Sequence, residues 1–179
     1  PVRMGVVGLG RFGRLHALTL ARLAEADLVA VVARRQASLE GLAAELPGTP
    51  GWTSLEQAIA ESGAEAWVVA CSTAAHVPVT RMLLQAGKSV LLEKPVAHTV
   101  EAAERVLAAA AAVDVVFQIA ENAQFWPEVV AVQRLIAEGA VGEVISARSW
   151  HCAPPLDDFY PEGAWRLSAG SAGGGVAVD

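Results

Sequence analysis

Short apolar runs alternate along the chain with segments whose apolar residues recur at helical spacing. The runs are of strand length and nearly continuous, which is typical of parallel strands buried on both faces; they cover residues 4–9, 27–33, 64–72, 89–95 and 115–120. Helical patterns lie between and after them, over 12–24, 38–46, 53–63, 77–86, 100–112 and 127–138. This alternation predicts an α/β fold with a doubly wound parallel sheet.

Local signals refine the ends of these elements. Thr53, with Glu56 three residues later, is typical of a capping box at a helix start. Pro78 is expected in the first turn of the next helix, and Gly87 is expected to end it. Beyond Gly142 the pattern alternates residue by residue and predicts a further strand over 142–150.

A glycine-rich loop joins the first strand to the first helix. Gly8, Gly10 and Gly13 fit the pattern G-x-G-x-x-G, with Arg11 and Phe12 between the second and third glycines. The three glycines permit a tight turn, a close approach of the backbone to a pyrophosphate, and close packing of helix on strand. The alternative is a purely structural turn. The strand before the loop and the helix after it favour dinucleotide binding.

Two arginines follow the second strand. An acidic residue there would bind the ribose hydroxyl of NAD, but this chain has Arg34, 21 residues after Gly13, and then Arg35. A guanidinium suits a 2′-phosphate, so NADP is predicted in preference to NAD. The alternative is that both arginines are solvated surface charges.

Composition narrows the classes of function. With 54% apolar and 18% charged residues the chain can bury a core, and a net charge of −6 argues against binding to nucleic acid or an anionic membrane. Cys71 and Cys152 lack metal-ligand spacing, and no metal site is expected. Because no apolar run is long enough to span a bilayer and no leader pattern opens the chain, a cytoplasmic protein is expected.

Four segments resemble one family of enzymes: "GLGRFGRLH", "GKSVLLEKPVA", "GAVGEV" and "WRLSAGSAGGGVAVD". They are similar, in the same order, to the glucose–fructose oxidoreductase and inositol dehydrogenase family, Gfo/Idh/MocA. The resemblance implies an N-terminal Rossmann domain and an α/β C-terminal domain that binds substrate and forms oligomers. It also implies an NAD(P)-dependent oxidoreductase that acts on sugars, cyclitols or related hydroxyl and carbonyl compounds.

The motif "EKP" carries the proposed chemistry. The resemblance implies that Lys94 lies beside the nicotinamide and hydrogen-bonds the reacting oxygen, that Glu93 belongs to the cofactor site, and that Pro95 is a cis-proline. Without the resemblance, Lys94 would be read as a surface charge.

Cofactor contacts are also expected at the carboxyl end of the strand predicted over 64–72. Ser72 and Thr73 lie where doubly wound sheets bind their ligands. His76 follows closely, and for it a cofactor contact and local packing at a helix start are both open.

The end of the chain carries the last expected site residue. The resemblance implies that Asp179 is the family's aspartate, and that a histidine acting as general acid/base comes four residues later, beyond this chain. Ala123 and Gln124 stand where many members carry basic residues, so a neutral sugar or polyol is expected as substrate.

The patterns predict residues 1–122 as the dinucleotide-binding domain, and the resemblance implies that 123–179 is the beginning of a substrate and oligomerisation domain. The expected function is hydride transfer between a nicotinamide cofactor and a sugar or polyol in a homo-oligomer. Two alternatives stay open: a non-catalytic NAD(P)-binding sensor, and a redox-neutral enzyme that holds NAD tightly.

Overall fold

The computed structural model describes residues 1–150. Its strands are β1 (Val2–Val7), β2 (Ala26–Val32), β3 (Gly51–Trp52), β4 (Ala66–Val69), β5 (Ser89–Leu92) and β6 (Phe117–Ile119). Its helices are α1 (Arg11–Leu20), α2 (Gln36–Ala43), α3 (Leu55–Glu61), α4 (Thr73–Gln85), α5 (Val100–Ala111), the 3₁₀ turn η1 (Asn122–Phe125) and α6 (Pro127–Ala137). Asp179, Cys152 and the segment "WRLSAGSAGGGVAVD" lie outside the described residues.

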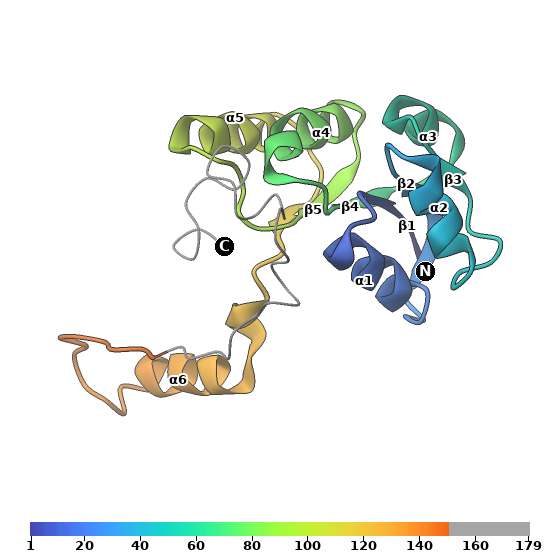
Figure 1. Cartoon of the computed structure of the whole chain (residues 1–179). Helices are drawn as coiled ribbons and strands as arrows, with labels where there is room; N and C mark the ends of the chain where they lie inside the picture. The colour runs from blue at the N-terminus through green and yellow to red at the C-terminus, as the bar shows by residue number, and fades with distance from the viewer. Residues whose placement is uncertain (151–179) are drawn as a thin grey trace. The chain divides into compact units, whose positions relative to one another are not determined.

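The described part of the chain forms two compact units, Pro1–Ala120 and the segment that begins at Glu121. In the first unit the strands pair in parallel in the order β3-β2-β1-β4-β5-β6, which makes the doubly wound parallel sheet that the sequence predicts (Figure 1). The order reverses between β1 and β4, and ligands bind beside such a reversal in open α/β sheets.

Helices cover both faces of this sheet. One core cluster joins residues of the sheet to α1 and α2, and the other joins them to α3, α4 and α5. Successive residues of β4 alternate between the clusters, with Val68 in one and Trp67 and Val69 in the other. The apolar runs are continuous because parallel strands are buried on both faces.

Gly5 in β1 makes room for the largest buried side chain. It pairs with Trp67 across the β1–β4 ladder, and a Cβ at Gly5 would collide with the Trp67 ring. Trp67 is fully buried, so a side chain at residue 5 would displace the ring from the core.

Some predicted element ends were wrong. Ser54, not Thr53, caps α3, and its Oγ accepts the N–H of Gln57 at 3.2 Å. Helix α4 begins at Thr73, so Pro78 lies in its interior rather than in its first turn. The end of β4 at the sheet edge sets the start of α4, and this tertiary constraint overrides the preference of proline for the first turn.

The predicted strand over 142–150 was also wrong. Residues 144–150 have no regular secondary structure, because a strand needs a ladder partner and no described segment pairs with them. In the same unit, α6 exposes apolar side chains, among them Val132 and Ile136. The assignment of this unit to a substrate domain stays a prediction.

Candidate cofactor site

The parallel strands end level with one another at one edge of the sheet. Cα register pairs Val7 with both Val32 and Val69, and Val69 in turn with Leu92. The ladder continues for one further bond on each strand, with the N–H of Gly8 donating to the Val32 carbonyl and the N–H of Glu93 to the Val69 carbonyl. The segments that follow β1, β2, β4 and β5 are therefore brought to the same edge.

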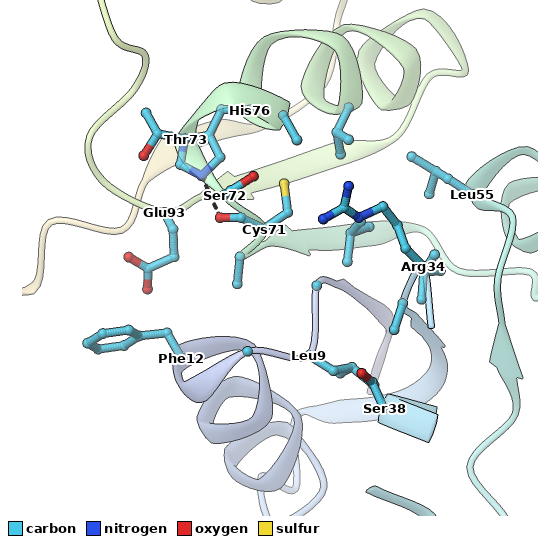
Figure 2. A pocket seen from close by; sticks show the side chains of 18 of the residues that line it. Leu9, Phe12, Arg34, Ser38, Leu55, Cys71, Ser72, Thr73, His76 and Glu93 are labelled. Carbon is cyan, nitrogen blue, oxygen red and sulfur yellow. Dashed lines mark hydrogen bonds between the residues drawn. The ribbon is translucent and has the colours of Figure 1, made fainter. Parts of the chain in front are cut away.

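A cavity of about 430 Å³ lies at this edge, within the first unit. Its volume is within the range of roughly 300–1,000 Å³ that is usual for small-molecule sites. In Figure 2, Arg34 reaches in from one side of the pocket, and Glu93 and His76 lie on the opposite side. The predicted site residues that line it are Gly8, Gly10, Arg11, Phe12, Arg34, Arg35, Ser72, Thr73, His76, Glu93 and Lys94.

The three glycines of the loop have different surroundings. Gly8 has φ +93°, and a Cβ there would lie 2.7 Å from the carbonyl oxygen of Ala70. Gly13 is buried rather than pocket-lining, and a Cβ on it would collide with the carbonyl oxygen of Gly8. Gly10 precedes α1, and a Cβ there would meet nothing within 4 Å. The backbone at Gly10 is therefore open to an approaching anion, which fits a dinucleotide pyrophosphate.

Polar side chains gather where β2 and β3 end. Arg34 and Arg35 are exposed and precede α2, whose first turns carry Ser38. Ser38 and Thr53 line the pocket as well, and sequence reasoning missed both as site residues. Thr53 directly follows β3, a strand of two residues, so its place at the shared edge of the sheet has no local signal in the sequence.

In the segment after β5, Lys94 lies between Glu93 and Pro95, and both of these neighbours make polar contacts with a histidine. The Glu93 carboxylate accepts the N–H of Lys94 at 3.2 Å through Oε2, and its Oε1 lies 2.7 Å from Nε2 of His16 on α1. The Lys94–Pro95 peptide bond is cis, as predicted. Pro95 does not line the pocket, but its carbonyl oxygen lies 2.8 Å from Nδ1 of His76.

Two titratable groups of the pocket have shifted pKa values: the buried His76 and the half-buried Cys71. The His76 ring is almost fully buried, and its Nε2 lies 3.2 Å from the Cys71 carbonyl oxygen. Burial lowers the pKa of His76, outweighing the opposing effects of the backbone carbonyls and of Glu93. Burial raises the pKa of the Cys71 thiol to about 11, so at neutral pH it is not an activated nucleophile.

The described residues contain neither a candidate metal site nor a candidate membrane-spanning helix. Within 1–150, no group of three or more His, Cys, Asp or Glu side chains could hold a metal ion. Within the same range, none of the helices has the length and apolar character needed to cross a membrane.

Comparison with known proteins gives the family. The model of an oxidoreductase family with an NAD-binding Rossmann fold, GFO_IDH_MocA, matches residues 2–121. The 1,5-anhydro-D-fructose reductase of Ensifer adhaerens is 30% identical over 179 residues, 99% of this chain and 52% of that protein. The inositol 2-dehydrogenase of Rubrobacter xylanophilus is 34% identical over 152 residues, 84% of this chain and 44% of that protein. The chain thus spans about half the length of the curated relatives it matches.

Solved structures agree with this assignment. GenD2 from gentamicin A biosynthesis, solved in complex with NAD, aligns with a TM-score of 0.81 and 30% identity over 99% of this chain and 50% of that chain. Apo scyllo-inositol dehydrogenase from Lactobacillus casei aligns with a TM-score of 0.75 and 26% identity, over 79% and 43%. The predicted fold class and family are confirmed: the chain belongs to the Gfo/Idh/MocA oxidoreductase family, with an NAD-binding Rossmann fold.

Proposed function

We propose that this chain binds a nicotinamide dinucleotide across the edge of its sheet. The observation that carries the proposal is the level ending of β1, β2, β4 and β5, which brings Arg34, Gly10 and Lys94 to one cavity. In doubly wound sheets the residue after the second strand contacts the adenosine ribose, and the loop after the first strand holds the pyrophosphate. The nicotinamide half then lies toward Ser72 and Lys94, at the ends of β4 and β5.

NADP is the proposed cofactor. Arg34 and Arg35 lie where an acidic residue would bind the ribose of NAD, and Ser38 adds a hydroxyl at the same end of the pocket. A 2′-phosphate between these groups receives charge-assisted hydrogen bonds, whereas the same arginines gain little from a neutral ribose hydroxyl.

The proposed reaction is hydride transfer between the nicotinamide and a carbinol or carbonyl carbon. The bound cofactor supplies the hydride acceptor or donor. Lys94 hydrogen-bonds the substrate oxygen and stabilises the charge that develops on it as the hydride moves. Asp179 and the acid/base histidine expected beyond it complete the proton transfer in this proposal.

A neutral sugar or polyol is the proposed substrate. Relatives are named as inositol 2-dehydrogenase and 1,5-anhydro-D-fructose reductase, and Ala123 and Gln124 leave η1 without a basic side chain. We further propose that the protein is a cytoplasmic homo-oligomer when extended to the length of its relatives.

The test is an activity assay on the protein extended to that length. We expect myo-inositol or 1,5-anhydro-D-fructose to change the nicotinamide absorbance, with NADP preferred to NAD. Binding of the cofactor without turnover of any sugar or polyol would favour a sensor instead. Cofactor retained through purification, with no net redox change, would favour redox-neutral chemistry.

A further inference from the structure

Two histidines from opposite faces of the sheet contact the tripeptide that carries Lys94. His16 lies on α1, which packs on one face, and His76 lies on α4, which packs on the other. His16 contacts the residue before Lys94, and His76 contacts the residue after it. Lys94 is thus bracketed by two contacts that come from separate layers of the fold.

The contact from α1 reaches the Lys94 backbone through the side chain of Glu93. Nε2 of His16 lies 2.7 Å from Oε1 of Glu93, and their side chains are only 25% and 13% exposed. A carboxylate can only accept, so Nε2 carries the proton in this contact. The second carboxylate oxygen of Glu93 accepts the N–H of Lys94 at 3.2 Å. One side chain therefore links the helix that follows the glycine loop to the peptide nitrogen of Lys94.

The contact from α4 joins two loops. The ring nitrogens of His76 lie 2.8 Å from the Pro95 carbonyl oxygen and 3.2 Å from that of Cys71. The shorter contact assigns the proton of the neutral ring to Nδ1, which donates to Pro95. Because both ring nitrogens face backbone carbonyls, His76 acts on the pocket through the segments after β4 and β5.

We propose that His16 and His76 are positioning residues that fix the backbone on both sides of Lys94, and so set where its side chain meets the nicotinamide half of the pocket. The inference rests on the proposed function, since it assigns the nicotinamide half to this end. A positioning role differs from a purely structural one in what it affects. A positioning role favours nucleotide binding at the Lys94 end of the pocket and leaves nucleotide binding at the Arg34 end unchanged.

The test compares two probes by calorimetry in the full chain. NADPH occupies the whole site, whereas adenosine 2′,5′-bisphosphate occupies only the adenosine half. We expect His16→Leu and His76→Leu to weaken NADPH binding by about 3- to 10-fold. Without the histidine contact, one or two groups around Lys94 must become ordered when NADPH binds, and this ordering lowers the affinity. The affinity for the bisphosphate should be unchanged. His16→Gln, which keeps an N–H donor at the end of its side chain, should restore most of the NADPH affinity.

Arg14→Leu is the matched control. Arg14 lies on the same helix and forms an ion pair with Glu45, and neither residue lines the pocket. We expect it to leave both affinities unchanged. If His76→Leu does not fold, because it leaves the Pro95 carbonyl without its donor, the His16 pair of variants decides the result.

The outcomes separate the inference from the proposed function. A wild-type chain that binds neither probe overturns the proposed function and the inference with it. If the wild type binds both probes and the His16 variants bind NADPH equally well, the inference alone is overturned. Equal weakening of both probes by His16→Leu also overturns it, because that result indicates a structural role.

Discussion

At the level of single residues, the glycines of the loop have different roles: Gly13 is required for folding, and Gly10 is proposed to be required for nucleotide binding. Gly10→Val should fold normally, since a Cβ there meets nothing within 4 Å, but the side chain would occupy the space into which a pyrophosphate must come. We expect NADPH binding to be lost in calorimetry while the melting temperature is retained. Gly13→Ala, in contrast, should lower the melting temperature, because its Cβ collides with a backbone carbonyl.

Gly41→Val in α2 is the matched control, since a Cβ there also meets nothing and the residue does not line the pocket. It should retain nucleotide binding. A folded Gly10→Val variant with wild-type affinity would show that the dinucleotide does not approach the loop.

Arg34 is the residue on which the proposed preference for NADP depends most. Replacing it with aspartate removes a charge-assisted contact to the 2′-phosphate and offers the ribose hydroxyls an acceptor. We expect Arg34→Asp to weaken NADP binding by about tenfold or more and to shift the preference toward NAD, measured by titration with both cofactors. Arg22→Asp, an exposed arginine outside the pocket, should change neither affinity. Equal affinities of the wild type for NADP and NAD would contradict the prediction.

At the scale of elements, His76 couples the packing of α4 to pH. Its pKa in the folded chain lies below the ordinary histidine value of 6.5, chiefly because of burial. Below that value the unfolded chain binds a proton that the folded chain resists, so the stabilising contribution of the neutral ring falls as the pH falls. It is complete above 6.5 and is lost toward the lower folded pKa.

The melting temperature of the wild type should therefore fall more steeply than that of His76→Gln between about pH 7 and pH 5. The variant should be less stable at neutral pH, because glutamine replaces a well-packed ring. This window avoids Glu56 and Glu101, whose pKa values are lowered from 4.5 by local hydrogen bonds. The other histidines are common to both proteins and cancel in the comparison. Parallel pH profiles of the two melting temperatures would contradict the lowered pKa of His76 as the cause of the pH dependence.

The elements of the first unit follow from local sequence, and their ends depend on the sheet. Apolar periodicity predicts the five longer strands and their helices, because burial on two faces leaves a continuous pattern. It misses β3, since two residues are too short for any period. The start of α3 at Leu55 has a local signal, the Ser54 cap, which the prediction placed one residue too early. The start of α4 at Thr73 follows the end of β4, and no side-chain cap marks it.

The candidate site, too, is partly predictable from local sequence and partly determined by tertiary packing. Gly10 and Arg34 stand at fixed spacings from the first strand, and the resemblance supplies Lys94. The contact between His16 and Glu93 joins residues 77 apart in sequence, and only the packing of α1 against the sheet brings them together. No spacing rule could have predicted it.

At the scale of the whole molecule, the two compact units carry different parts of the proposed enzyme. The cofactor pocket belongs to residues before Ala120. The segment that begins at Glu121 exposes large apolar side chains such as Ile145, Trp150 and Leu135. Exposed apolar groups of this kind favour association, so we expect the 179-residue chain to self-associate in solution.

This chain should bind the dinucleotide but should not turn over substrate. The glycine loop, the arginines after β2 and Lys94 all lie in the first unit, so nucleotide binding should not depend on residues outside that unit. The acid/base histidine implied by the family is expected beyond Asp179, and a positioned acid/base contributes about 10²–10⁴-fold in rate. The walls that orient a polyol against the nicotinamide are expected there too. Parallel assays should therefore find nucleotide binding in both this chain and a form extended to the length of its relatives, and multiple turnovers only in the extended form. Equal turnover by the 179-residue chain alone would locate the whole catalytic apparatus within it and overturn the assignment of proton transfer to residues beyond it.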